Sequence, residues 1–168
     1  VVQAMLYGCD DRAAIAAAAN LLEGIHFVQL SIWVNPLSDD VDSLLLKSDL
    51  MNNVEQLAIS VGEVKIADPV QTLLHLASDV PSLHIEQNSV MTIDHRSSYF
   101  FGVYDADWAK IIVEMFKGKM GKLYIENYFF TGYLSSKAMD ELRDRLPTFG
   151  KHIWFSASCS KDYINQFT

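Results

Sequence analysis

The chain has 168 residues, half of them hydrophobic, which predicts a folded chain with a real core rather than a disordered segment. Thirteen lysines and arginines stand against 21 aspartates and glutamates, and the net charge of −8 disfavours binding to nucleic acid or to an anionic membrane surface. The longest nearly apolar stretch, Ala13 to Leu22, is too short to cross a membrane and predicts a buried helix instead.

The two cysteines, Cys9 and Cys159, are too few and too far apart in sequence for a disulfide framework or a zinc site. We expect Cys9 to occupy a repeat position, Cys159 to be a small buried side chain, and the compartment to be the reducing cytoplasm. The chain begins Val1-Val2-Gln3 without a basic or apolar leader. No targeting signal is therefore recognised, and the sequence has the character of a segment from a longer protein.

A short apolar pattern recurs six times along the chain. Residues 27–37 fit the pattern L-x-x-L-x-L-x-x-N-x-L at every apolar position when branched and aromatic residues are allowed, and residues 80–90 fit it again. Three partial copies and a degenerate last copy fall into the same phase. The residues at the asparagine position are, in chain order, Cys9, Asn35, Gly62, Asn88, Tyr128 and Ser158.

The spacings between these six positions are 26, 27, 26, 40 and 30 residues, so four of the five are close to one period. In each copy an alternating apolar pair, such as Leu30 with Ile32 or Leu57 with Ile59, predicts a short strand that points both side chains into a common core. The side chain at the asparagine position is expected to satisfy backbone groups in the turn after the strand.

A helical pattern follows each copy, so strand and helix are predicted to alternate along the chain. The residues predicted to begin helices after the first are Ser38 with Asp39 and Asp40, Asp68 before Pro69, Asp105, and Ser135 or Ser136. The acidic run 39–42 is interpreted as a helix start and not as a calcium loop, because it lacks the central glycine and terminal glutamate of such loops.

Residues 91–104 lengthen one repeat by roughly a dozen residues, which typically places an insertion on one face of a repeat protein. This insertion contains Tyr99-Phe100-Phe101, which is unusually apolar for a free loop. Two interpretations follow, an exposed contact loop or a flap that folds back over the core.

Strands in a parallel sheet are about 4.8 Å apart whereas a helix is roughly 10 Å wide, so stacked units must curve with their strands on the concave side. The sequence therefore predicts one α/β domain over residues 1–168, a solenoid of about five to six repeats with helices on its convex face. The alternative is a compact doubly wound α/β domain with an enzymatic or small-ligand role, which needs a crevice at a switch in strand order.

This arrangement resembles the leucine-rich-repeat superfamily, and its period of about 26 to 28 residues is similar to the ribonuclease-inhibitor and cysteine-containing classes. Gly62, Tyr128 and the 40-residue interval depart from the pattern. The resemblance implies a horseshoe that binds another protein or another domain of the parent chain, in the cytoplasm and without a cofactor. In such families the arc is a ligand-sensing or autoinhibitory arm, as in the NOD-like receptors of innate immunity, or the substrate-recognition arm of F-box ubiquitin-ligase receptors. No nucleotide-binding loop or F-box segment is recognised here, so either role depends on other domains.

The residues beside each Leu-x-Ile pair are predicted to face outward on the concave side and to form the binding surface. Exposed aromatic rings on rigid strands provide large contact areas, so Trp33, Tyr124 and Trp154 are the expected anchors. The alternative is that these rings pack against one another or against other parts of the chain. The other candidates are His84, Glu86 and Glu126, followed by Ser31, Glu55, Ser60, Lys122 and His152.

Catalysis is not expected. Asp94-His95-Arg96 and the pair His84 and Glu86 place acids and bases near one another in sequence. Adjacent residues of an extended segment point apart, however, and no nucleophile, base and oxyanion stabiliser occur at a recognised spacing.

Overall fold

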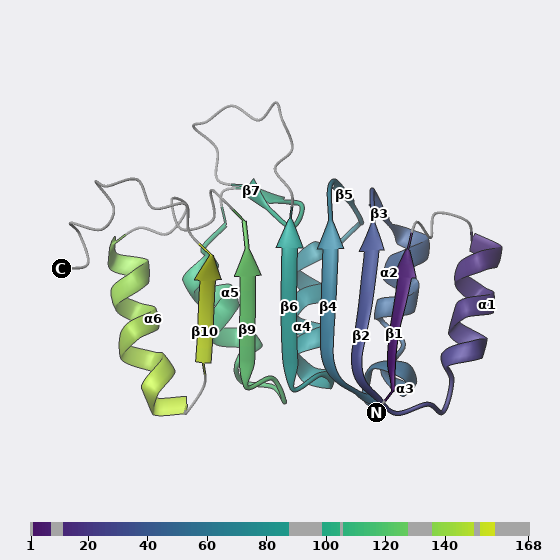
Figure 1. Cartoon of the computed structure of the whole chain (residues 1–168). Helices are drawn as coiled ribbons and strands as arrows, with labels where there is room; N and C mark the ends of the chain where they lie inside the picture. The colour runs from purple at the N-terminus through teal and green to yellow at the C-terminus, as the bar shows by residue number, and fades with distance from the viewer. Residues whose placement is uncertain are drawn as a thin grey trace.

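The computed structural model describes residues 2–7, 12–87, 99–104, 106–127, 136–149 and 152–156. Six strands form one sheet in which every pairing is parallel, and their order across the sheet is their order along the chain (Figure 1). These strands are β1 (Gln3–Tyr7), β2 (Phe27–Val34), β4 (Val54–Val61), β6 (Ser82–Gln87), β9 (Lys122–Glu126) and β10 (His152–Ser156).

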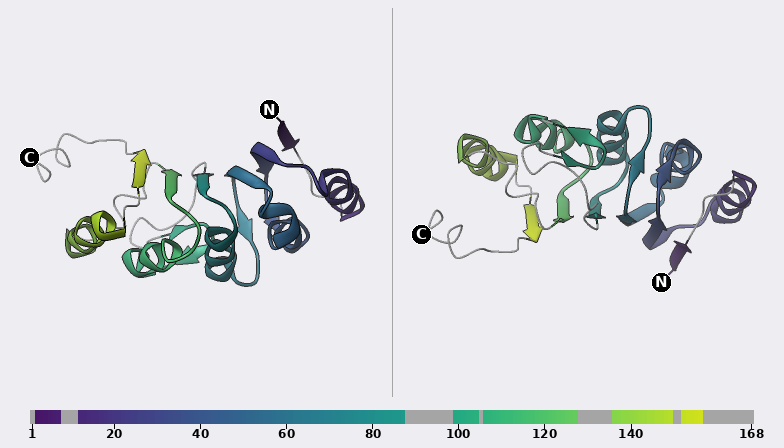
Figure 2. Two further views of the ribbon diagram at one scale, coloured as in Figure 1. Left: turned by 90° about the horizontal axis from the view of Figure 1, so that it is seen from below. Right: turned by 90° about the horizontal axis from the view of Figure 1, so that it is seen from above.

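The helices lie along one side of this sheet, and the two ends of the strand row curve away from them, so that the concave side is the face opposite the helices (Figure 2). They are α1 (Arg12–Leu22), α2 (Asp39–Leu45), α3 (Ser48–Met51), α4 (Pro69–Asp79), α5 (Trp108–Met115) and α6 (Ser136–Phe149). Two short pairs complete the described elements, β3 (Leu37–Ser38) with β5 (Val64–Lys65) and β7 (Tyr99–Phe100) with β8 (Val103–Tyr104). The predicted alternation of strands and helices around a parallel sheet is confirmed.

The strand pairings reproduce the predicted repeat phase. The residues that pair across successive strands, from Gln3 through Gln29, Gln56, Ser82 and Lys122 to His152, are 26, 27, 26, 40 and 30 residues apart. These are the spacings found between the asparagine positions of the sequence pattern. The phase is therefore correct even for the degenerate last copy, although Cys9, Asn88, Tyr128 and Ser158 themselves lie outside the described residues.

Two ladders of aliphatic side chains run across the sheet and form the centre of the core. Because the register is parallel and even, each leucine of one strand lies opposite a leucine of the next, and the isoleucine two residues later does the same. All of these side chains are buried, and each contributes roughly 2 kcal/mol relative to an exposed position. The ladders are Leu30, Leu57, Leu83 and Leu123, and Ile32, Ile59, Ile85 and Ile125.

Asn35 performs the role predicted for the asparagine position and also explains the departure at Gly62. Its Oδ1 accepts a hydrogen bond from the backbone N–H of Glu63 at 3.0 Å, in the turn after the neighbouring strand. A Cβ atom on Gly62 would lie 2.6 Å from Cγ of Asn35, which is closer than packing permits. The glycine is therefore needed because the amide of the preceding repeat occupies the space of a side chain.

In the next two repeats, buried amides one position before the predicted asparagine positions bind backbone groups, while Asn88 and Tyr128 lie outside the described residues. Buried Gln87 accepts a hydrogen bond from the N–H of Phe101 at 2.7 Å and donates one to the carbonyl of Gly62 at 3.1 Å. Buried Asn127 donates to the carbonyl of Gln87 at 3.3 Å. Among the described residues, these two side chains satisfy backbone groups that the sheet leaves over in this region.

The described part of the insertion is a flap over the core. Strands β7 and β8 form an antiparallel hairpin, and the rings of Phe100 and Phe101 are buried beneath it, with Phe100 edge-on to Trp108 at 5.3 Å. Phe101 has a backbone φ of 50°, an unfavourable value for a bulky residue that its buried ring and its hydrogen bond to Gln87 maintain. Residues 91–98 of the insertion lie outside the described residues.

Two of the helix predictions need correction. The N-cap of α5 is Asp107, whose Oδ1 accepts the N–H of Lys110 at 3.2 Å, and not Asp105. The helix predicted as buried, α1, buries only Ile15, Ala19 and Leu22, while Leu21 is 76% exposed, because the single layer of helices packs only one side of each helix against the sheet.

The cap at Asp68 is confirmed, since its side chain accepts the N–H of Gln71 at 3.0 Å, and Pro69 follows it as the first residue of α4. The acidic run after Ser38 is indeed a helix start, although the Ser38 side chain makes no capping bond.

Asp42 on α2 accepts a hydrogen bond from the hydroxyl of Thr72 on α4 at 2.7 Å. Burial raises the pKa of this carboxyl above its usual value, and the hydrogen bond from Thr72 offsets only part of that rise. The folded state therefore binds the proton more tightly than the unfolded chain does. Between the unfolded and the folded pKa, the free energy of unfolding that Asp42 contributes falls as the pH rises.

Asp42→Asn removes the charge and retains an oxygen that can accept the Thr72 hydroxyl. We expect the variant to be at least as stable as the parent at pH 7. As the pH rises above about 4, its free energy of unfolding should fall less than that of the parent. Urea unfolding at a series of pH values measures both effects. If the free energy of unfolding depends on pH equally in the variant and the parent, the Asp42 carboxyl is not the group that causes the decline.

Candidate functional site

The candidate site is the face of the sheet that points away from the helices, here called the open face (Figure 2). Helices cover the opposite face, and no helix of the described ranges lies over this one. Because the register is even, its side chains form three rows across the strands. The first row is Gln3, Gln29, Gln56, Ser82, Lys122 and His152; the middle row is Met5, Ser31, Ala58, His84, Tyr124 and Trp154; the carboxylate row is Tyr7, Trp33, Ser60, Glu86 and Glu126.

The middle row carries a continuous strip of rings over β6, β9 and β10. Tyr124 and Trp154 are stacked, with centroids 4.4 Å apart and planes 5° from parallel. His84 lies on the other side of Tyr124 at 5.7 Å. Trp154 remains 43% exposed in spite of the stack. The two rings predicted as anchors here face outward and also pack against one another, and their role in binding stays a prediction.

The third predicted anchor belongs to a separate group at the other edge of the sheet. Trp33 on β2 lies 6.0 Å from Tyr7 on β1, in a tilted arrangement, and Tyr7 is 75% exposed. Strands β4 and β6 stand between Trp33 and Tyr124, a separation of about 14 Å at the usual strand spacing. The sequence did not indicate Tyr7 and Met5, because it does not reveal which residues of the weak first copy stay exposed.

Two carboxylates lie next to each other on the open face. Glu86 on β6 pairs directly with Glu126 on β9 in the strand register. Nε2 of His84 lies 3.2 Å from Oε2 of Glu126, at ion-pair distance but without hydrogen-bond alignment. The histidine therefore contacts the carboxylate of the neighbouring strand and not Glu86, the partner suggested by sequence. Within the described chain, Glu86 forms no ion pair.

A shallow groove of about 650 Å³ opens where the strands begin, at the first row. Its polar lining includes Gln56, Lys119, Lys122 and His152. Glu55, which was predicted to lie among the outward residues, lines this groove. Its Oε1 lies 2.8 Å from Nε2 of His26, at hydrogen-bond distance. Two lysines and Glu55 therefore line the groove, whereas the opposite side of the open face carries the carboxylates of Glu86 and Glu126.

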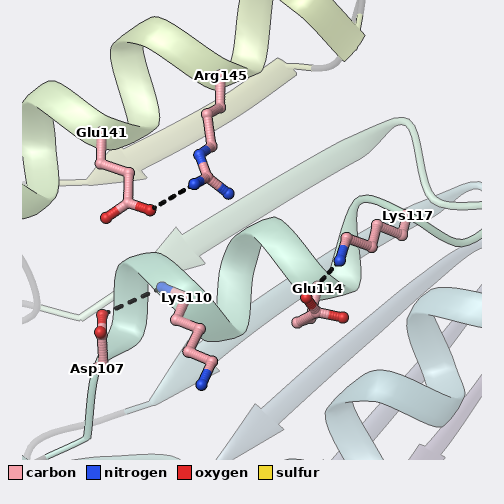
Figure 3. A network of polar contacts seen from close by, with 6 residues as sticks. All are labelled: Asp107, Lys110, Glu114, Lys117, Glu141 and Arg145. Carbon is pink, nitrogen blue, oxygen red and sulfur yellow. Dashed lines mark hydrogen bonds and ion pairs between the residues drawn. The ribbon is translucent and has the colours of Figure 1, made fainter.

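On α5 and α6 the charged residues drawn in Figure 3 form local pairs, whereas Arg12 on α1 lies 3.9 Å from Asp40 on α2. Lys117 pairs with Glu114 at the end of α5, and Arg145 contacts Glu141 at 3.3 Å on α6. Exposed pairs three or four residues apart on one helix contribute a few tenths of a kcal/mol at most. The surface of α5 and α6 therefore has the properties of an ordinary solvated helix face.

The described residues contain no candidate metal cluster. No group of three or more His, Cys, Asp or Glu among them is placed to hold a metal ion. The predicted acid and base cluster at Asp94-His95-Arg96 lies outside the described residues, as do Cys9 and Cys159. Of the helices in the described ranges, none has the length and apolar character needed to cross a membrane.

Comparison with known proteins adds no further constraint on this face. No family model, no curated protein and no solved structure matches the chain, so its function must be argued from the geometry described above.

Proposed function

We propose that this chain is a leucine-rich-repeat-like solenoid that acts as a protein-binding arm of a larger protein, in a sensing, autoinhibitory or other regulatory role. It binds another protein, or another domain of its own chain, through the open face and catalyses no reaction. The repeat phase shared by all six strands supports the solenoid, because each unit adds one strand and one helical segment to the last. The strand order has no reversal in the described sheet, and a reversal is what creates the crevice of a doubly wound enzyme.

The observation that carries the proposal is the exposed stack of Tyr124 and Trp154 on a sheet face without a covering helix. Rings held on rigid strands lose little side-chain entropy when a partner covers them, which is why tryptophan and tyrosine are frequent interface hot spots. A face that served only the internal stability of the sheet would not need a tryptophan ring that remains 43% exposed.

The test is capture of partners from a native lysate by the parent chain and by matched variants. Tyr124→Ala with Trp154→Ala removes the stacked pair, Trp33→Ala removes the second group, and Lys110→Ala with Lys117→Ala alters the helix side as a control. We expect the stacked-pair variant to lose a discrete partner, with affinity lowered about thirtyfold or more, as for typical hot-spot residues. Circular dichroism verifies that each variant is folded. Equal capture by the parent and by both open-face variants would refute binding through this face.

A further inference from the structure

The charge pattern around the stacked rings indicates what kind of group a partner places there. Glu86 and Glu126 occupy directly opposed positions on adjacent strands, where like charges destabilise the sheet. Neither the middle row nor the carboxylate row contains a lysine or arginine among the residues that the structure describes. Among the described residues, the only basic group in contact with either carboxylate is the imidazole of His84, which is charged only when protonated.

The cations of the first row are too far away to neutralise these carboxylates. Lys122 precedes Glu126 by four residues on the same strand, which is about 13 Å in an extended chain. Exposed charges at this distance are largely screened at physiological salt, where the Debye length is about 8 Å. The corner of the open face formed by β6, β9 and β10 is therefore an aromatic platform beside two carboxylates that no lysine or arginine of the described ranges neutralises.

We propose that this corner receives an arginine side chain from the protein that binds the open face, an inference that rests on the proposed function. A guanidinium is planar and always charged, so it can lie on the ring surface of Trp154 or Tyr124 while its N–H groups donate to a carboxylate of the next row. The two rows are two residues apart along the strands, about 7 Å, which one long side chain can bridge. Binding also relieves the repulsion between Glu86 and Glu126.

A lysine fits this corner less well. Its ammonium is a compact and strongly hydrated charge that cannot stack on a ring and bind a carboxylate in two-pronged geometry at the same time. An acidic group is excluded by the two carboxylates. The corner therefore favours an arginine-containing segment of the partner over other charged segments.

The experiment uses short random peptides displayed on phage and selected on the immobilised full chain. Enriched peptides are synthesised as selected, with each arginine replaced by citrulline, which is isosteric and neutral, and with each arginine replaced by lysine. Their dissociation constants are measured by titration calorimetry against the parent and three double variants. These are Glu86→Gln with Glu126→Gln, Tyr124→Ala with Trp154→Ala, and the control Glu114→Gln with Glu141→Gln, which changes the net charge equally on the helix side.

We expect arginine in the enriched peptides, and a loss of about tenfold or more in affinity on replacement by citrulline or on the Glu86 and Glu126 substitutions. The helix-side control should change affinity less than about twofold. Peptides that need the stacked rings but bind equally well with citrulline, with lysine, or to the Glu86 and Glu126 variant would overturn the arginine site and leave the proposed function standing. Peptides that bind all variants alike would overturn both.

Discussion

Phe101→Ala is expected to lower the free energy of unfolding by about 4 kcal/mol. The ring is fully buried under the hairpin of β7 and β8, so its removal loses the burial of an aromatic side chain and leaves a cavity that the core can only partly fill. The backbone N–H of the same residue is held by Gln87, which restricts how far the hairpin can collapse into the space. Urea denaturation followed by fluorescence and by circular dichroism gives the change.

Phe101→Leu is the matched control, because it retains most of the apolar volume and should cost clearly less than the alanine variant. If Phe101→Ala costs less than about 1 kcal/mol, then the hairpin does not contribute to the core in solution. Residues 99–104 would in that case return to the alternative interpretation, an exposed contact loop.

The repeat phase could be predicted because it depends only on local pattern. Each strand carries its own Leu-x-Ile pair, and burial on one face requires the same alternation in every copy, whatever lies between the copies. The 40-residue interval therefore did not disturb the register, and Lys122 still pairs with Ser82. Whether the insertion packs on the core or forms a contact loop could not be predicted in this way, since the apolar character of Tyr99-Phe100-Phe101 is compatible with burial in the core or against a partner.

The polar residues were harder to place because their role depends on neighbours in other repeats. Sequence identified Asn35 and explained its position, but it did not indicate that Gln87 and Asn127 bind backbone groups. Gln87 binds the carbonyl of Gly62 and the N–H of Phe101, so its role depends on a neighbouring strand and on the hairpin of β7 and β8. The sequence pattern indicates the type of side chain at a position but not which backbone groups that side chain reaches.

The same limitation applies to the open face. Its six main candidates, Trp33, His84, Glu86, Tyr124, Glu126 and Trp154, all lie on it, because alternation along a strand fixes the face of each residue. Which candidates touch one another depends on the register between strands. That register placed Trp154 on Tyr124 and His84 beside Glu126, whereas sequence distance alone had suggested His84 with Glu86.

Leu57→Ala is the second substitution with a large expected effect, a loss of about 3 kcal/mol in the free energy of unfolding. Leu57 is fully buried at the centre of the leucine ladder, with Leu30 and Leu83 opposite it on the two flanking strands. The cavity therefore borders three repeats at once, and none of them can close it without disturbing its own register. Thermal and urea unfolding both report the change.

Gln56→Ala, one residue earlier on the same strand, provides the control for this prediction. Gln56 belongs to the first row of the open face and is only partly buried, so its truncation should alter the free energy of unfolding by less than about 0.5 kcal/mol. A large difference between two adjacent residues follows only if the strand keeps one face in the core and the other toward solvent. Similar costs at the two positions would mean that both faces are packed, and the open face could then not be free to bind a partner.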